Sequence, residues 1–221
     1  ALVGAGTFMS QIFVAPFMLN VRGLAGVRGD KKLFSGLDLS VRSGEWLHIQ
    51  GQKGAGKTRL LRLLAGLSMP AEGEICWNQI SITDTHSDFR SHLLYFGHHG
   101  ALKEDLTALE NLTFASVIDG VAWSEEATLI ALKAWYRLGL QGRENLPVRV
   151  LSAGQKRRVM LARLLTRQAT LWILDEPFTA LDVAAVDLLS SLITEHVRNG
   201  GMAVLTSHQT IPMPGGQVVR L

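Results

Sequence analysis

The sequence predicts an α/β fold with a mostly parallel sheet, a smaller antiparallel β piece and an inserted helical subdomain. Short apolar stretches alternate with helical stretches along most of the chain, a pattern that is typical of parallel sheets. One apolar stretch, 46–50, runs directly into a glycine-rich loop that precedes a helix. The middle of the chain differs, because two segments there carry Trp and Leu at helical spacing.

Each element is predicted from composition and spacing. Two strand-like stretches open the domain at 18–24 and 34–41, and an apolar strand follows at 46–50. The later strands are expected at 171–174 and 202–206. The helices are expected at 57–64, 109–117, 125–138, about 154–167 and 183–198.

Length and composition limit the class of protein. The chain has 221 residues, which suits one α/β domain with a small inserted subdomain. Hydrophobic residues make up 47% and charged residues 19%, so a large core can form. The net charge of +3 is too weak to indicate nucleic acid as a partner. Cys76 is the single cysteine, which excludes an internal disulfide framework and the usual four-ligand zinc site.

The first residues form an uncharged stretch. Residues 1–19 approach the length of a membrane span, which needs about 20 apolar residues, but small and polar residues interrupt them. No basic segment precedes this stretch, so a signal peptide is not expected. We expect residues 1–17 to be a loose extension, with a membrane anchor as the alternative. The domain then spans 18–221, with its helical subdomain at about 98–158.

The glycine-rich loop matches the phosphate-binding pattern G-x-x-x-x-G-K-[ST] in full. Its residues are Gly51, Gln52, Lys53, Gly54, Ala55, Gly56, Lys57 and Thr58. Backbone N–H groups of such a loop cradle phosphate oxygens, and the following helix adds its positive end. We expect Lys57 to reach the β- and γ-phosphates and Thr58 to ligate Mg²⁺. A chance glycine-rich turn is the alternative, and the strand before the loop and helix after it argue against that.

A second motif places two acids at the end of an apolar strand. Asp175 and Glu176 follow the strand expected at 171–174, and Pro177 ends it. Phosphoryl transfer needs a cradle, a cation, a metal and an oriented nucleophile. We therefore expect Asp175 to hold Mg²⁺ through water and Glu176 to polarise the attacking water. Two solvated acids on a loop would be the alternative if the phosphate-binding loop were absent.

Residues 151–155, Leu-Ser-Ala-Gly-Gln, resemble the LSGGQ signature of the ABC transporter family. In this family the signature meets the γ-phosphate bound by another subunit. The resemblance therefore implies a head-to-tail dimer with two ATP molecules between its subunits, in which Ser152, Gly154 and Gln155 contact nucleotide. A simple helix cap at Ser152 is the alternative for this pentapeptide alone.

Further family motifs occur in the expected order. Residues 178–182, Phe-Thr-Ala-Leu-Asp, resemble the D-loop, which implies that Asp182 reaches across the dimer. His208 follows the last core strand and resembles the switch histidine, which contacts the γ-phosphate. The resemblance covers about residues 18–221 and implies an ATP-hydrolysing subunit with a membrane-spanning partner.

Two positions depart from the family pattern. Arg28 occupies the place of the aromatic residue that usually stacks on adenine, and a guanidinium plane can also stack on a ring. His99 occupies the place of a glutamine that senses the metal and the membrane partner. Histidine can donate a hydrogen bond there, but its protonation depends on pH.

Within the family, several stretches resemble the ATPases of cytochrome c maturation exporters, described as the haem exporter type. They include residues 34–37, 97–98, 102–103, 106–112, 152–158, 171–182 and 206–209. This resemblance implies a peripheral location on the cytoplasmic face of a bacterial inner membrane, or on the matrix face of a mitochondrial one. The alternatives are the ATPase of another small-molecule, lipid or peptide exporter, and a soluble ABC ATPase without a transport role.

Three consecutive basic residues, Lys156, Arg157 and Arg158, follow the signature. Such a run can suggest nucleic acid, but it is more often the solvated face of a helix. We interpret it as a solvated face near the expected partner surface, and expect no nucleic acid partner.

Overall fold

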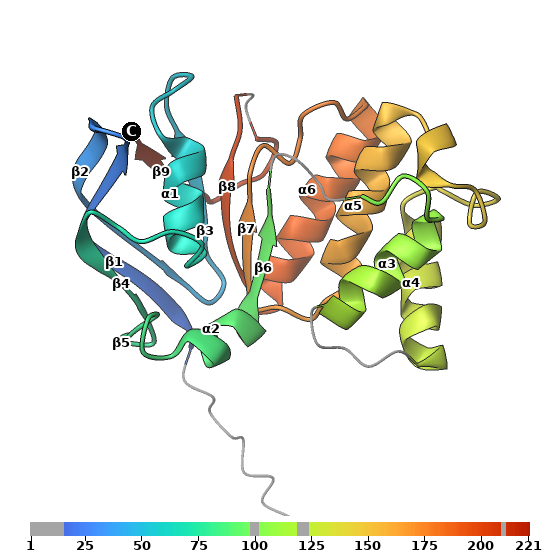
Figure 1. Ribbon diagram of the computed structural model, residues 1–221, viewed down its shortest axis with the longest axis horizontal. Helices are drawn as coiled ribbons and strands as arrows, with labels where there is room; N and C mark the ends of the chain where they lie inside the picture. Colours follow the sequence, from blue (N-terminus) through green and yellow to red (C-terminus); the bar gives the residue numbers. More distant parts are fainter. Residues whose placement is uncertain (1–15, 98–101, 119–123, 209–210) are drawn as a thin grey trace, which may run out of the picture.

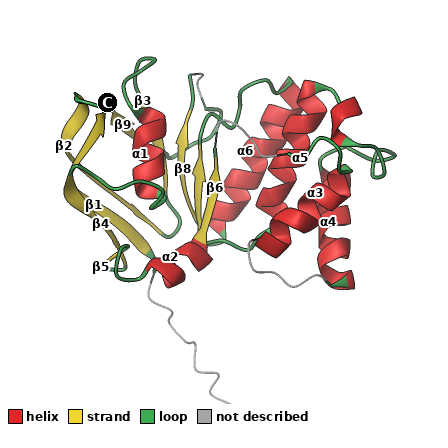
Figure 2. Ribbon diagram, in the orientation of Figure 1, coloured by secondary structure: helices red, strands yellow, loops and turns green. Residues whose placement is uncertain are grey.

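The computed structural model describes residues 16–97, 102–118, 124–208 and 211–221. Two sheets and a set of helices make up the molecule (Figures 1 and 2). A small antiparallel sheet lies on one side, the parallel sheet occupies the centre, and most helices lie on the other side. The predicted fold class is confirmed in all three parts.

The antiparallel sheet has the strand order β2-β1-β4-β5. Its strands are β1 (Met18–Arg28), β2 (Lys31–Arg42), β4 (Glu72–Trp77) and β5 (Ile80–Ser81). β1 and β2 form a hairpin that extends beyond both strands expected from sequence, to the pair Arg28 and Lys31. The residues at the end of this hairpin are exposed. Their backbone pairing therefore has no apolar pattern that would mark it in the sequence.

The parallel sheet has the strand order β6-β7-β8-β3-β9. Its strands are β3 (Trp46–Gln50), β6 (Leu93–Phe96), β7 (Leu171–Leu174), β8 (Met202–Thr206) and β9 (Gln217–Arg220). Strands β3, β7 and β8 have the bounds predicted from sequence. The neighbours β7 and β8 pair with Leu174 opposite Leu205, so the residues that follow both strands meet at one edge of the sheet.

Helices cover both faces of this sheet (Figure 1). On one side lies α1 (Lys57–Leu64), which ends where predicted. On the other side lie α6 (Val183–Arg198) and α5 (Ala153–Thr166), with α3 (Ala108–Ile118) and α4 (Glu125–Arg137) farther out. The helix α2 (His86–His92) leads into β6. Five of these six helices were predicted from sequence, whereas α2 and the strands β4, β5, β6 and β9 were not.

Two hydrophobic clusters form the core, one on each face of the parallel sheet. Successive residues of β7 alternate between them: Leu171 and Ile173 face the cluster that holds α1, while Trp172 and Leu174 face the cluster that holds α4, α5 and α6. This alternation is the normal period of a strand with both faces covered. The loops at the strand ends are thereby held between two packed layers.

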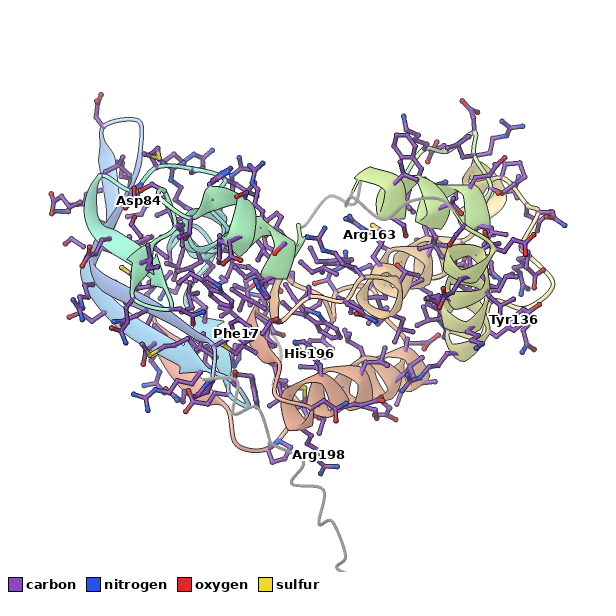
Figure 3. All side chains as sticks on the ribbon, turned by 90° about the horizontal axis from the view of Figure 1, so that it is seen from below. Phe17, Asp84, Tyr136, Arg163, His196 and Arg198 are labelled. Atoms are coloured by element: carbon purple, nitrogen blue, oxygen red, sulfur yellow. The ribbon has the colours of Figure 1, made fainter. Side chains whose placement is uncertain are left out.

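The chain enters the fold through Phe17. Its ring stacks on Trp77 with centroids 5.3 Å apart, on the side of the molecule that the antiparallel sheet forms (Figure 3). Residues 1–15, which hold most of the expected loose extension, lie outside the described residues. Among the residues that are described, no helix combines the length and apolar character that a membrane crossing requires.

His196 joins α6 to the parallel sheet (Figure 3). Its ring stacks on Trp172 with centroids 3.9 Å apart and planes 4° apart, and its Nε2 lies 3.1 Å from the carbonyl oxygen of Met202. No side chain fits at Gly201, because a Cβ atom there would lie 2.2 Å from the imidazole. The neutral ring is therefore a packing element of the core.

We expect acid to destabilise the fold in part through His196. Burial lowers the pKa of His196, and hydrogen bonds to Met202 and Thr170 offset part of that shift. A base with a lowered pKa in the fold stabilises it above the unfolded pKa of about 6.5, and this contribution is lost as pH falls. The drop in Tm from about pH 7 to about pH 5 should be smaller in His196→Phe, which keeps the stacked ring. His86→Phe, at an exposed histidine, is the control; equal drops in all three proteins would contradict the assignment.

Candidate active site

The glycine-rich loop connects β3 to α1 and turns sharply at Gly54 and Gly56. Their φ angles are +89° and +104°, in the region that favours glycine. A Cβ atom on Gly56 would also lie 3.1 Å from Leu33, so a side chain there would be crowded as well as strained. The loop conformation thus depends on the glycines that the phosphate-binding pattern requires.

The loop folds around its own lysine. Lys57 is only 7% exposed, and its Nζ donates hydrogen bonds to the carbonyl oxygens of Gly51 at 2.8 Å and Gln52 at 3.3 Å. A buried ammonium group needs such acceptors. The lysine is therefore held in the middle of the loop, where phosphate oxygens would come within its reach.

The two acids lie at the end of β7, and Thr206 at the end of β8 holds both residues. The hydroxyl of Thr206 donates to Oδ1 of Asp175 and accepts from the backbone N–H of Glu176, both at 2.9 Å. Thr206 is fully buried, and Asp175 and Glu176 are 1% and 8% exposed. One hydroxyl therefore fixes the start of the acidic segment relative to the neighbouring strand.

Glu176 has a strained backbone and a histidine neighbour. Its φ of +49° lies in the left-handed region, which is uncommon for a residue with a side chain and clusters at functional sites. Its Oε1 lies 3.2 Å from Nε2 of His208, which follows β8 and has a mostly exposed side chain. The structure thus brings together the two residues that sequence proposed for catalysis.

A cleft of about 500 Å³ joins the loop to these residues. Its lining includes Arg28, Lys53, Gly54, Gly56, Lys57, Thr58, Glu176 and His208. Arg28 ends β1, and its exposed side chain lines the cleft, so base stacking by Arg28 stays a prediction. Eight of the residues proposed from sequence therefore surround one cavity.

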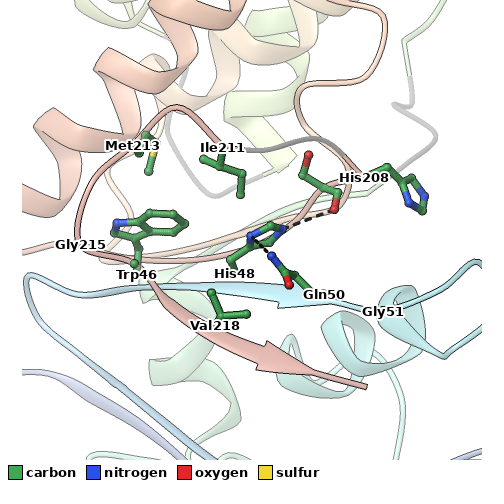
Figure 4. Close-up of a pocket in the computed structure, with 11 residues that line it drawn as sticks. Trp46, His48, Gln50, Gly51, His208, Ile211, Met213, Gly215 and Val218 are labelled. Carbon is green, nitrogen blue, oxygen red and sulfur yellow. Dashed lines mark hydrogen bonds between the residues drawn. The ribbon is translucent and has the colours of Figure 1, made fainter.

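A second cavity, of about 550 Å³, lies beside this cleft and shares His208 with it (Figure 4). Trp46, His48 and Gln50 alternate along β3 and line it. Nε2 of Gln50 lies 3.2 Å from Nδ1 of His48, and Nε2 of His48 lies 3.4 Å from the carbonyl oxygen of Ser207. Because an amide nitrogen can only donate, His48 carries its proton on Nε2 and donates it to Ser207. Burial, the largest effect, lowers the pKa of His48, which favours this neutral form. β3 thus supports the segment that carries His208.

The signature residues lie at the start of α5 and do not line the cleft. Ser152 caps this helix: its Oγ accepts the N–H of Gln155 at 3.2 Å, and the side chain of Gln155 accepts the N–H of Ser152 at 3.0 Å. This is the helix cap considered as the alternative, and it also leaves Ser152 exposed. Among the described lining residues of the cleft, none comes from 152–155. Contact with nucleotide in a second copy stays a prediction.

Asp182 likewise lies apart from the cleft. It caps α6 by accepting the N–H of Ala185 at 2.8 Å, and it accepts two hydrogen bonds from Arg158 at 2.7 and 3.0 Å. The Ala185 bond is the main cause that lowers the pKa of the Asp182 carboxyl. The aspartate is therefore a fixed anion at an exposed helix start. The other predicted residue, His99, lies outside the described part of the chain.

The carboxylates suit a divalent cation. Oδ2 of Asp175 is buried and has no hydrogen-bond partner among the described residues, whereas Oε1 of Glu176 lies 3.2 Å from Nε2 of His208. Leaving the Asp175 oxygen unsatisfied is costly, and Mg²⁺ or one of its water ligands would satisfy it. Thr58 lines the same cleft, and its hydroxyl would supply a further oxygen ligand. The residues present therefore fit the ion predicted from sequence.

A sequence profile of the ABC transporter family matches residues 34–179. The chain belongs to the ABC transporter family. The matched segment contains the phosphate-binding loop, the signature and both acids that follow β7. Membership confirms the family and the class of protein predicted from sequence, an ATP-hydrolysing subunit that serves transport, and with it nucleotide binding.

Curated relatives narrow the type. The chain is 51% identical to the cytochrome c biogenesis ATP-binding export protein CcmA of Dechloromonas aromatica, over 92% of this chain and 98% of that protein. It is 50% identical to the CcmA protein of Nitrosospira multiformis and 45% identical to that of Escherichia coli O157:H7, each over at least 90% of both chains. The resemblance to ATPases of cytochrome c maturation is thereby confirmed.

Solved structures agree with the architecture. An ABC transporter ATP-binding protein from Pyrococcus furiosus has a TM-score of 0.79 at 22% identity, covering 92% of this chain and 97% of that one. A dimer of the cassette MJ0796 bound to ADP and Pi has a TM-score of 0.76 at 24% identity, covering 86% and 88%. At these identities the similarity shows the fold.

Sequence reasoning missed two residues of the site. Thr206 was not proposed, although parallel pairing of the strands before it and before Asp175 would place them side by side. Arg157 was interpreted as part of a solvated basic face, and this is wrong: it is 7% exposed and contacts the Glu176 carbonyl. Its burial depends on how α5 packs, which the basic run itself does not indicate.

Thr206→Val tests the hydroxyl that holds the acidic segment. The substitution keeps the shape of the side chain but leaves Asp175 Oδ1 and the Glu176 N–H without this buried partner. We expect the free energy of unfolding to fall by about 1–3 kcal/mol in a denaturant titration. Thr206→Ser keeps the hydroxyl and should retain most of the stability. Equal stabilities for the Val and Ser variants would show that the hydroxyl does not hold this segment.

Proposed function

We propose that the chain is the ATP-hydrolysing, energy-coupling subunit of an ABC exporter of the haem exporter type, required for the biogenesis of c-type cytochromes. The observation that carries the proposal is one cleft in which residues of the phosphate-binding loop face Glu176, the second acid of the buried pair that follows β7. The identity to CcmA proteins over nearly the whole chain supports the type of exporter.

ATP binds with its phosphates on residues 51–58. The backbone N–H groups of the loop and the start of α1 surround the phosphate oxygens, and Lys57 exchanges its bonds with loop carbonyls for bonds to the β- and γ-phosphates. Arg28 stacks its guanidinium plane on the base from the end of β1. Mg²⁺, when bound by Thr58 and through water by Asp175, neutralises charge on the phosphates.

Hydrolysis uses the pair Glu176 and His208. Glu176 orients a water whose oxygen forms a bond to the γ-phosphorus while the bond from that phosphorus to the β–γ bridging oxygen breaks. The products are ADP and inorganic phosphate, which takes up the protons of the water. His208 donates a hydrogen bond to a γ-phosphate oxygen from the loop that β3 supports.

The complete site forms between two copies arranged head to tail. Two helix starts away from the cleft of their own copy carry Ser152, Gly154, Gln155 and Asp182, and Ser152 and Asp182 are exposed there. In the proposed dimer the signature faces the γ-phosphate in the cleft of the other copy. ATP thus closes the dimer and hydrolysis reopens it. This cycle drives a membrane-spanning partner, while the ATPase lies peripherally on the cytoplasmic face of a bacterial inner membrane or the matrix face of a mitochondrial one.

The role in cytochrome biogenesis is tested in cells by replacing the native gene with the Glu176→Gln variant. This change keeps the size of the side chain but removes the charge that orients water, so we expect ATP turnover to fall at least about 100-fold. Staining membranes for covalently bound haem should show loss of c-type cytochromes with b-type cytochromes retained. Glu195→Gln, at an exposed position on α6, is the matched control.

The outcomes separate the two parts of the proposal. Loss of turnover with normal c-type cytochromes would leave an ABC ATPase that serves another small-molecule, lipid or peptide exporter. Parent-level turnover by Glu176→Gln would overturn the catalytic assignment itself. If the chain did not fractionate with membranes, a soluble ABC ATPase would replace the transporter subunit.

A further inference from the structure

A buried arginine joins the signature helix to the acidic segment. Arg157 lies on α5, one turn after Ser152, and is 7% exposed. Its guanidinium donates a hydrogen bond from an Nη atom to the carbonyl oxygen of Glu176 at 2.5 Å. The same group lies over the ring of Phe96, at the end of β6, with Cζ 4.6 Å from the ring centroid.

Packing alone does not account for a charge at this position. Burial lowers the pKa of Arg157, while the charges of Asp175 and Glu176 raise it, so the surroundings both oppose and favour the cation. Its Nε has no hydrogen-bond partner among the described residues. Apolar residues of similar volume often serve stability as well as a buried charge does or better. We therefore look for the role of this charge in its contact with the Glu176 carbonyl oxygen.

The backbone N–H and the backbone carbonyl of Glu176 are held from two sides. The hydroxyl of Thr206 on β8 accepts its N–H, and Arg157 on α5 donates to its carbonyl. Between these two bonds the backbone keeps a φ of +49°, which surrounding structure must maintain. Because the side chain leaves from this backbone, its direction toward the cleft depends on both contacts.

The next residue of α5 contacts the other end of the same segment. Arg158 donates two hydrogen bonds to Asp182, the residue that caps α6. Two neighbouring arginines thus fasten the start and the end of residues 176–182 to one helix. Since α5 begins with the signature, a shift of this helix is transmitted directly to Glu176.

We propose that Arg157 is a positioning residue that sets the Glu176 carboxylate for catalysis and couples its orientation to the signature helix. The proposal rests on the catalytic role of Glu176 given under the proposed function. Arg157 is not among the residues that line the cleft, so it acts through its contact with the Glu176 backbone. It therefore affects the rate of the chemical step more than the affinity for ATP.

The test compares Arg157→Gln and Arg157→Lys with the parent, using the full-length chain in membranes of its native host. A displaced catalytic group lowers kcat without changing ground-state binding. We expect kcat for ATP to fall at least about tenfold in Arg157→Gln, with KM within about twofold of the parent. Arg157→Lys keeps the charge but loses the planar group over Phe96. Its kcat should lie between that of the parent and that of Arg157→Gln.

Arg137→Gln is the matched control, because it removes an arginine from a solvent-exposed ion pair with Glu195 between α4 and α6. Exposed pairs of this kind contribute little, so its kcat should stay within about twofold of the parent. If Arg157→Gln does not fold, the test uses Arg157→Lys, which should show a lowered kcat with KM within about twofold of the parent. A folded Arg157 variant with parent kcat, or one whose only defect is a raised KM, would overturn the proposal.

A double-mutant cycle with Glu176→Gln separates positioning from general damage. If Arg157 acts through the carboxylate, adding Arg157→Gln to Glu176→Gln should lower the residual single-turnover rate by less than about twofold. If the double variant instead shows the product of the two single reductions in rate, Arg157 acts independently of the Glu176 carboxylate and the proposal is overturned. Parent turnover in Glu176→Gln alone would instead refute the proposed function, so the two failures are distinguishable.

Discussion

The structure of the site depends on the parallel pairing of β7 with β8. This pairing sets Leu174 opposite Leu205, so the next residues, Asp175 and Thr206, meet at the edge of the sheet. The Thr206 hydroxyl can then satisfy one oxygen of Asp175 and the N–H of Glu176 in a region without access to solvent. Buried carboxylates are stable only with such partners. The other oxygen of Asp175 has no partner among the described residues and is the one that the proposed metal or its water would use.

Three elements converge on this edge, and each contributes a different kind of constraint. β3 supplies the glycine-rich loop and, through His48, supports the segment that carries His208. β8 supplies the hydroxyl of Thr206. α5 supplies Arg157 from the far side of the sheet, where a separate hydrophobic cluster fixes the helix. The two core layers therefore act on the same short segment, which explains how a left-handed backbone at Glu176 can persist.

Most of the fold and the motifs of the site follow from sequence, whereas some contacts between those motifs do not. The phosphate-binding loop and the acids after β7 are local patterns, so their place was predictable without a structure. β9 was missed because its side chains are mostly exposed and only backbone pairing with β3 defines it. Thr206 and Arg157 were missed for a related reason: each contacts residues at least 19 positions away, through strand register or helix packing that composition does not reveal.

We propose that the complete site forms only between two copies, and the mass of the Glu176→Gln variant in solution shows whether it does. Sedimentation would be measured with ATP and Mg²⁺, with ATP and a chelator, and with neither. We expect the mass of two chains only when ATP and Mg²⁺ are both present, and the mass of one chain when Ser152→Arg blocks the signature. If Glu176→Gln binds ATP to saturation but keeps the mass of one chain, the site does not require a second copy.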